Sequence, residues 1–145
     1  MTLEPGMTFE LPFEVTEDLV TDVAGSVARR VLATPRMIAV MERTSMQAVW
    51  SELPEGTTCV GYEVCIKHVS SAPYGGKCVC TALLTEVIDG RKLRFDVEVK
   101  YDGRTVGIGT HERRIVDVGK FEGRETVGSS GGVSRCSEDP RGRTS

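Results

Sequence analysis

The chain has 145 residues, a length that fits one domain with a sizeable buried core. It is 39% hydrophobic and 27% charged, with a net charge of −3, which is ordinary for a globular protein. This mild acidity offers no electrostatic basis for binding nucleic acid or an anionic membrane surface. No apolar run is long enough to span a bilayer, and the acidic N-terminus lacks the features of a signal peptide, so we expect a cytoplasmic protein.

The chain has five cysteines, and an odd number without a secretion signal indicates reduced thiols. Cys78 and Cys80 form a C-x-C pattern, but there is no second pair at ligand spacing and no histidine close by in the sequence. Residues two apart on a strand share a face, so we interpret both as small apolar core residues. We therefore expect no metal and no cofactor.

The first predicted element is a strand from Met7 to Val15, because every second residue from Met7 to Phe13 is apolar. Pro12 within it indicates a sheet edge or a bulge. The following segment, Thr16 to Ala33, fits either a short helix or an ordered loop.

A central helix is predicted from Thr34 to Leu53. Thr34 is a suitable N-cap, Pro35 suits the first turn, and Pro54-Glu55-Gly56 ends the helix. Apolar side chains cover most of its circumference, which predicts burial on most sides. Glu42 lies in its middle, where a charge is costly unless the protein uses it.

From Thr57 the periodicity changes to two, which indicates strands. The first ends near Ser70, and its residues Val60, Tyr62, Val64, Ile66 and His68 share one side. Three more strands follow, with hairpin turns predicted at Asp89-Gly90 and Asp102-Gly103. They span Lys77 to Ile88, Leu93 to Tyr101 and Arg104 to Val118.

The predicted order is one strand, one helix and four antiparallel strands linked by short turns. A meander of that length curls, so an apolar helix in its concave face would be enclosed. The apolar pattern stops after Gly119, and residues 128–145 have almost nothing to bury. We expect one domain over residues 1–121 and a disordered tail over residues 122–145.

A β-α-β-β-β-β order around a central helix is the hotdog fold, of the α+β class. Within it, the runs ATPRMIAVME, GYEVCIKHVSSAP and GTHERRIV resemble the fluoroacetyl-CoA-type thioesterase family of hotdog enzymes. That family has a Thr at the start of the helix, a Glu eight residues later, a His further on, and a GTHER segment in the last strand. Thr34, Glu42, His68 and Gly109–Arg113 occupy these positions. The resemblance covers roughly Gly6 to Phe121.

The resemblance implies hydrolysis of a small acyl-CoA thioester to free acid and CoA, with Thr34, Glu42 and His68 as the catalytic set. It implies a homodimer or a dimer of dimers with the CoA arm between protomers. Gly61 matches a glycine near the family's acyl pocket, where a missing side chain lets a ligand approach the backbone. The segment from Asp22 to Ala33 contains no aromatic residue, so only aliphatic side chains such as Val23 and Val27 would close the pocket. Selectivity for fluoroacetyl therefore does not carry over.

Thioester hydrolysis needs a base, a proton shuttle and donors for the carbonyl oxygen. Glu42 in an enclosed site suits a base or nucleophile, and His68 facing the helix can pair with it. The Thr34 hydroxyl lies beside free N–H groups at the helix start. Eight helical residues span about 12 Å, so Thr34 and Glu42 of one chain cannot bond directly. Either His68 and the substrate bridge them, or, as we hypothesise, the site combines two subunits.

Structural roles are the alternatives at each position. Thr34 can be an N-cap alone, His68 a satisfied core histidine, and Glu42 a surface carboxylate paired with Arg36 or Arg43. His111 and Arg113 share one side of the last strand. Together with Arg36 they are candidates for binding the substrate or its phosphates, and a solvated strand face is the alternative for the first two.

Two rival functions remain. A hotdog hydratase or dehydratase would take a His and an Asp from the central helix region, and this helix has neither. A non-catalytic acyl-CoA-binding dimer would keep the pocket but would have no use for a Glu and a His facing each other.

Overall fold

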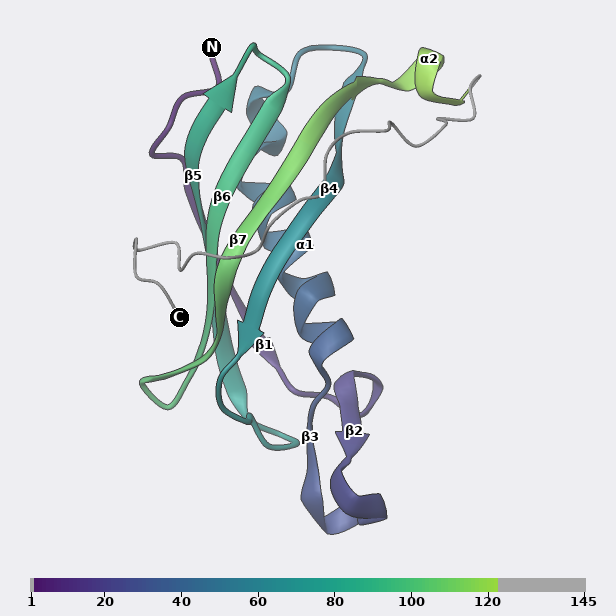
Figure 1. The fold of residues 1–145 in the computed structure, drawn as a ribbon, viewed down its shortest axis with the longest axis vertical. Coiled ribbons are helices and arrows are strands. Elements are labelled where there is room, and N and C mark those ends of the chain that lie inside the picture. Colours follow the sequence, from purple (N-terminus) through teal and green to yellow (C-terminus); the bar gives the residue numbers. More distant parts are fainter. Residues whose placement is uncertain (1, 123–145) are drawn as a thin grey trace.

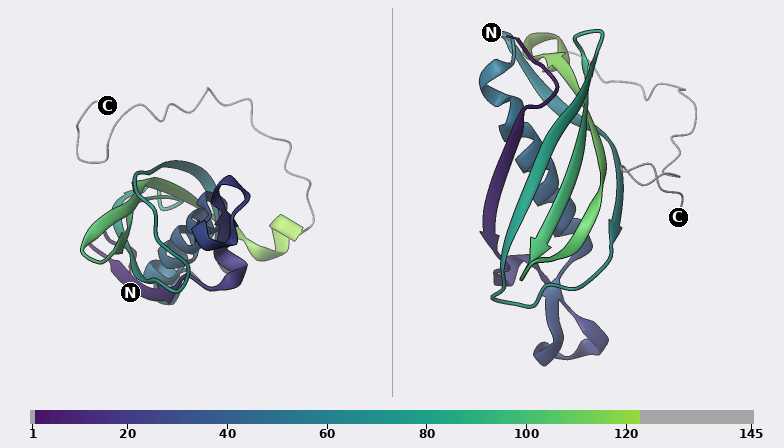
Figure 2. Two further views of the ribbon diagram at one scale, coloured as in Figure 1. Left: turned by 90° about the horizontal axis from the view of Figure 1, so that it is seen from below. Right: turned by 90° about the vertical axis from the view of Figure 1, so that its left-hand side faces the viewer.

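A five-stranded antiparallel sheet wraps around one long helix in the computed structural model, which describes residues 2–122 (Figures 1 and 2). The helix α1 (Thr34–Val49) continues into a 3-10 turn, η4 (Trp50–Glu52). This confirms the predicted α+β fold with a curved sheet around a central helix. The sheet order is β1-β5-β6-β7-β4, and its strands are β1 (Thr8–Glu14), β4 (Thr57–His68), β5 (Lys77–Ile88), β6 (Lys92–Tyr101) and β7 (Arg104–Asp117).

The two predicted hairpin turns are present. Asp89 and Gly90 have φ values of 56° and 63°, and Asp102 and Gly103 have 51° and 76°. Positive φ at both central residues is the geometry of a type I′ turn, whose twist matches that of the flanking strands. These turns join β5 to β6 and β6 to β7. The chain then ends its described part in a short helix, α2 (Val118–Glu122), and the predicted tail beyond it lies outside the described residues.

The predicted four-stranded meander is wrong in one respect. β4 pairs with β7 and not with β5, which instead pairs with β1 on its other side. The strands β1 and β4, which α1 separates in the chain, are the opposite edges of the curved sheet, and β5 to β7 lie between them (Figure 1). The edge position predicted for β1 from Pro12 is confirmed.

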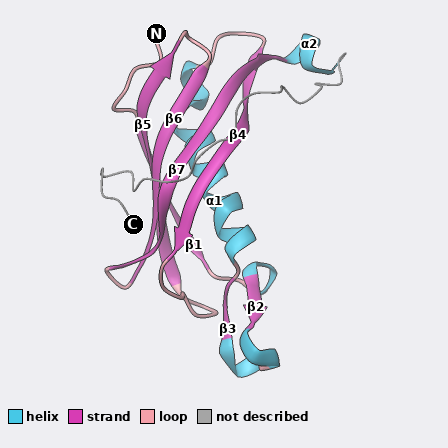
Figure 3. Cartoon of the chain, in the orientation of Figure 1, coloured by secondary structure: helices cyan, strands magenta, loops and turns pink. Residues whose placement is uncertain are grey.

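The segment before the helix is neither of the two structures expected for it. It forms a small antiparallel pair, β2 (Val20–Asp22) and β3 (Arg30–Leu32), with 3-10 turns η1 (Glu17–Leu19), η2 (Val23–Gly25) and η3 (Val27–Arg29). The Arg30 guanidinium pairs with Glu17 at 3.2 Å and with Asp22 at 3.3 Å. Each of the two strands has three residues, too few to show a periodicity in the sequence. The hairpin extends past the start of α1 (Figure 3).

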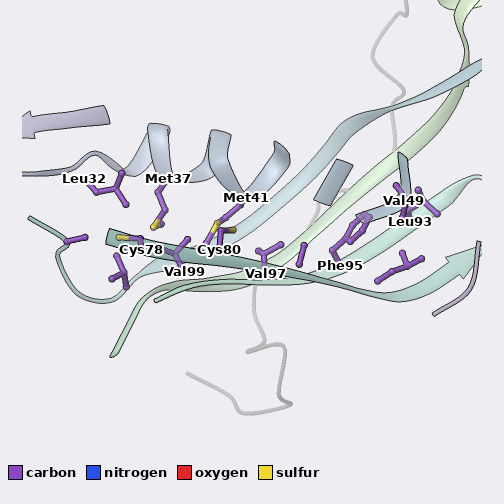
Figure 4. Packing of buried hydrophobic residues seen from close by; sticks show 14 of the residues in the cluster. Leu32, Met37, Met41, Val49, Cys78, Cys80, Leu93, Phe95, Val97 and Val99 are labelled. Carbon is purple, nitrogen blue, oxygen red and sulfur yellow. The ribbon is translucent and has the colours of Figure 1, made fainter. Parts of the chain in front are cut away.

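The core lies between one face of α1 and the concave face of the sheet (Figure 4). Met37, Met41 and Val49 of the helix pack there against Cys80 and Phe95, among other residues of the sheet. The opposite face of α1 is open in the single chain, and Trp50 just beyond it is 60% exposed. The prediction that the helix is buried on most sides is therefore wrong for one chain, because the sheet covers only one face.

No helix within residues 2–122 is long and apolar enough to cross a membrane.

Cys78 and Cys80 are buried free thiols, as predicted. Burial raises the pKa of the Cys80 thiol to about 11, which keeps it protonated and unreactive. Cys59 is also a buried free thiol. Cys65 is disulfide-bonded, so the expectation of reduced thiols is wrong at that residue.

A β-bulge in β4 changes which side chains face the helix. The register of β4 against β7 shifts between Gly61 and Glu63, so Tyr62 is the extra residue. Tyr62 is 50% exposed, and the Arg114 guanidinium lies 3.6 Å from its ring centroid on the outer face. The predicted shared face is therefore correct from Val64 to His68 but wrong for Val60 and Tyr62, since one inserted residue reverses the alternation.

Candidate active site

The first cluster of the site joins the start of α1 to the end of β4. Thr34 Oγ1 lies 2.7 Å from His68 Nδ1, within hydrogen-bond distance. The N-cap residue of α1 is Ala33, so the prediction that Thr34 caps the helix is wrong. Its hydroxyl is bonded to an imidazole from a distant strand, and Pro35 takes the expected first-turn position.

His68 has an imidazole suited to accept a proton. Burial lowers its pKa below the ordinary value of 6.5, so the ring is neutral at neutral pH. Its Nε2 is buried and has no hydrogen-bond partner within residues 2–122. A satisfied core histidine would have both nitrogens paired, so the structure argues against that alternative.

The second cluster surrounds Glu42. Its side chain is 41% exposed, which is less buried than the sequence indicated. Glu42 Oε2 lies 3.7 Å from Arg113 Nη1, so its ion-pair partner comes from β7 and is neither Arg36 nor Arg43. The carboxylate also lies against Gly61, where a Cβ atom would overlap Oε2. Gly61 thus leaves the space that the carboxylate occupies.

His111 and Arg113 lie beneath this cluster, only 2% and 8% exposed. A solvated strand face is therefore wrong for both. Arg113 donates from Nε to Cys59 Sγ at 3.1 Å and from Nη2 to the Cys59 carbonyl at 2.9 Å. No role for Cys59 in the site is predicted from the sequence. Cys59 lies two residues before Gly61 on the same strand, so the two residues share a face, and this spacing could have identified Cys59 as a neighbour of the site.

The two clusters do not meet within one chain. Thr34 and His68 lie at the first turn of α1, whereas Glu42 and Arg113 lie about two turns further along it. Eight residues of helix separate the two side chains by roughly 12 Å along the axis. A single chain therefore brings two of the three predicted catalytic residues together and leaves the third apart.

The remaining predicted site residues lie near the helix start or in the segment before it. Arg36 is exposed in the first turn of α1, and Val23 in η2 is 45% exposed. The side chain of Val27 lies outside the described part of the structure. Within residues 2–122, no three His, Cys, Asp or Glu side chains are grouped so as to hold a metal ion.

Comparison with known proteins identifies the family of this chain. Residues 15–119 match the family model described as fluoroacetyl-CoA-specific thioesterase. The fluoroacetyl-CoA thioesterase of Streptantibioticus cattleyicolor is 32% identical over 94 residues, which cover 65% of this chain and 67% of that protein.

Solved structures show the same relationship. A structure of the fluoroacetyl-CoA thioesterase FlK matches with a TM-score of 0.76 and 26% identity, covering 85% of this chain and 95% of the other. A mutant of that enzyme in complex with fluoroacetate and CoA matches with a TM-score of 0.73 and 28% identity, covering 82% and 99% of the two chains. The match extends over both clusters and the elements that carry them. This chain therefore belongs to the fluoroacetyl-CoA-specific thioesterase family, whose members are thioester hydrolases with the hotdog fold.

Proposed function

We propose that this chain hydrolyses a small acyl-CoA thioester to the free acid and CoA, with Thr34, Glu42 and His68 as its catalytic groups. The observation that carries the proposal is the 2.7 Å contact between Thr34 Oγ1 and His68 Nδ1 at the start of α1. A hydroxyl bonded to a neutral imidazole is an arrangement that moves protons in acyl transfer. Family membership supports the choice of a thioester as the substrate.

In the proposed reaction, His68 takes a proton from water as the water oxygen bonds to the thioester carbonyl carbon. The carbon–sulfur bond then breaks, and His68 returns the proton to the departing CoA sulfur. The Thr34 hydroxyl and the first-turn N–H groups, which lack intrahelical partners, stabilise the negative carbonyl oxygen. The products are a carboxylic acid and CoA, so every atom of water and thioester is accounted for.

Glu42 completes this site from a second subunit. Thr34 is exposed and Glu42 is 41% exposed in the single chain, so both remain accessible to a partner chain. A two-fold homodimer would bring the Glu42 of one chain toward the Thr34 and His68 of the other. There the carboxylate would act as a base or would orient His68. This assignment removes the 12 Å separation that one helix imposes.

The substrate contacts follow from the same placement. Gly61 and the Val23 and Val27 segment would border the acyl group, and exposed Arg36 offers charge for the CoA phosphates. His111 and Arg113 are too buried in this chain to reach those phosphates. We therefore assign them to the support of Glu42 and not to direct contact with CoA. We expect a cytoplasmic homodimer that needs no cofactor.

Free-thiol release tests the reaction. Acetyl-, fluoroacetyl-, propionyl-, butyryl- and hexanoyl-CoA would be offered to wild type and to Thr34→Ala, Glu42→Gln and His68→Asn. Glu55→Gln, an exposed residue away from both clusters, is the matched control. We expect each site variant to lose roughly 100-fold or more in kcat/KM and the control to be unchanged. If wild type releases no thiol, the proposed activity is wrong, and a non-catalytic acyl-CoA-binding module becomes the favoured function.

Mixed dimers test the origin of Glu42. Differently tagged Thr34→Ala and Glu42→Ala chains would be co-expressed, and the doubly tagged dimer would be purified. One of its two sites would carry both substitutions and the other neither, so about half of the wild-type activity should return. A proven heterodimer as inactive as its parents would place the whole site within one chain.

A further inference from the structure

The hydrogen bonds of His111 determine which of its ring nitrogens carries the proton. Nδ1 lies 2.8 Å from the Glu63 carbonyl oxygen, which can only accept, so Nδ1 must donate. Nε2 lies 3.2 Å from Arg113 Nη1, and a guanidinium can only donate, so Nε2 must accept. Both contacts are satisfied at once only by the neutral ring protonated on Nδ1.

We propose that His111 is a positioning residue whose neutral, Nδ1-protonated ring holds the Arg113 guanidinium in place against Glu42. The proposal rests on the function proposed above for Glu42, but its geometry is independent of that function. His111 itself does not touch the reacting atoms, because its side chain is 2% exposed and lies beneath the carboxylate.

Arg113 is the link between the two residues. Cys59 accepts hydrogen bonds from Nε and Nη2, and His111 accepts from Nη1, so each guanidinium nitrogen is held by β4 or β7. Nη1 also lies 3.7 Å from Glu42 Oε2. A guanidinium restrained on every nitrogen presents its charge to the carboxylate at one fixed place.

The bulge in β4 and the packing around the ring explain how His111 is held. The Glu63 carbonyl that accepts from Nδ1 belongs to the residue just after the bulge, where the register of the strand ladder shifts. The ring stacks with Phe95 at a centroid distance of 6.3 Å. On the other side, a Cβ at Gly61 would be 3.5 Å from His111 Cε1, so the backbone of β4 borders the ring closely.

Burial and the neighbouring Arg113 charge keep His111 neutral at neutral pH. Burial and the Arg113 charge lower its pKa from the ordinary 6.5, against the opposing effects of the Glu63 carbonyl bond, Glu42 and Glu112. Glu112 is engaged on the other face of the sheet by Arg94 and Arg114. Protonation of Nε2 would place an N–H against the guanidinium and end the contact.

Nuclear magnetic resonance tests the geometry without any assay of activity. The chain has two histidines, so a long-range ¹H–¹⁵N spectrum shows two imidazoles, and His111→Gln identifies one of them. We expect His111 to show a protonated Nδ1 and an unprotonated Nε2 from pH 8 to pH 6.5. A ring protonated on Nε2, or an imidazolium at pH 7, would overturn the proposal even in an active enzyme.

A matched pair of variants tests the positioning role. In His111→Gln the side-chain carbonyl can still accept from Arg113, whereas in His111→Asn the shorter amide keeps only the donor toward the Glu63 carbonyl. We expect the Arg113 guanidinium, followed by its side-chain ¹⁵N signals, to rotate more slowly in wild type and His111→Gln than in His111→Asn, where only the bonds to Cys59 remain. Equal guanidinium mobility in all three proteins would contradict the proposal whether or not the protein hydrolyses thioesters.

Kinetic measurements on the same two variants distinguish a positioning role of His111 from a purely stabilising one. We expect His111→Asn to lose roughly 10-fold or more in kcat with KM little changed, and His111→Gln to stay within about threefold of wild type. Melting temperatures would be measured alongside. Activity losses that follow the loss of stability equally in both variants would show that His111 only supports the fold. If wild type has no activity while the ring and guanidinium behave as expected, the proposed function fails and the positioning geometry stands.

Discussion

Substitution of Gly61 by alanine gives the sharpest test of how the site is built. The added Cβ would overlap Glu42 Oε2 and would lie 3.5 Å from Glu42 Cδ. Gly61 has no positive φ, so the backbone accepts alanine without strain. The clash falls on the end of a flexible side chain that is 41% exposed, which can move aside at little cost in folding free energy.

The expected result is therefore a loss of activity with almost no loss of stability. Moving the carboxylate by about 1 Å away from Arg113 should lower kcat/KM by roughly 100-fold, because catalysis depends on position at that scale. The melting temperature should change by no more than about 4 °C, which corresponds to about 1 kcal/mol for a chain of this size. Thiol release and differential scanning calorimetry measure the two quantities on the same preparation.

A double-mutant cycle ties the effect to Glu42. Glu42→Asp shortens the side chain by one methylene and draws the carboxylate back from the added methyl group. The loss in the Gly61→Ala, Glu42→Asp protein should then be smaller than the sum of the two single losses in activation free energy. Strictly additive losses, or a Gly61→Ala protein within twofold of wild type, would refute the reasoning.

Three further predictions follow from other parts of the structure. Burial lowers the pKa values of His68 and His111 below 6.5, so below that pH the unfolded chain binds more protons than the folded chain. The free energy of unfolding should therefore be highest above about pH 6.5 and should fall as the pH drops toward the folded pKa values. A melting temperature equal at pH 7.5 and pH 5.5 would contradict this. Phe95→Ala should lower the free energy of unfolding, measured with denaturant, by about 3–5 kcal/mol, because the ring is fully buried against the helix. A decrease below about 1 kcal/mol would refute that packing. Cys80 is fully buried with a pKa of about 11, so its thiol should resist a thiol reagent in the folded protein and react on unfolding. Mass spectrometry of the peptide that contains Cys80 measures the labelling. Fast labelling of the native protein would show that the thiol is accessible.

Local signals in the sequence were sufficient for most of the secondary structure. The Asp89-Gly90 pair predicted a turn that needs positive φ, and both residues have it. The strand predicted from Lys77 to Ile88 has these bounds as β5, and Pro35 marked the helix start. Such signals succeed because each depends on the conformational preference of one or two residues, which tertiary contacts here do not override.

The strand partners and the small hairpin before α1 could not be read in the same way. Whether β4 pairs with β5 or β7 depends on where the helix places it, which no local pattern records. The strands β2 and β3 have three residues each, too short to show a period, and β3 is bonded to the distant segment around Ala72 and Tyr74 through its backbone.

The sequence by itself determined the family, the curved sheet around one helix, and the identity of Thr34, Glu42 and His68 as the residues to examine. Only the tertiary structure decided what each one contacts. The Thr34 hydroxyl is hydrogen-bonded to His68 and does not cap the helix as expected, and Glu42 forms an ion pair with Arg113 of β7. The physical reason is that a side-chain contact depends on register and curvature. One inserted residue, Tyr62, reverses the faces of β4, so the partners of a residue follow from the whole sheet and not from its neighbours in the chain.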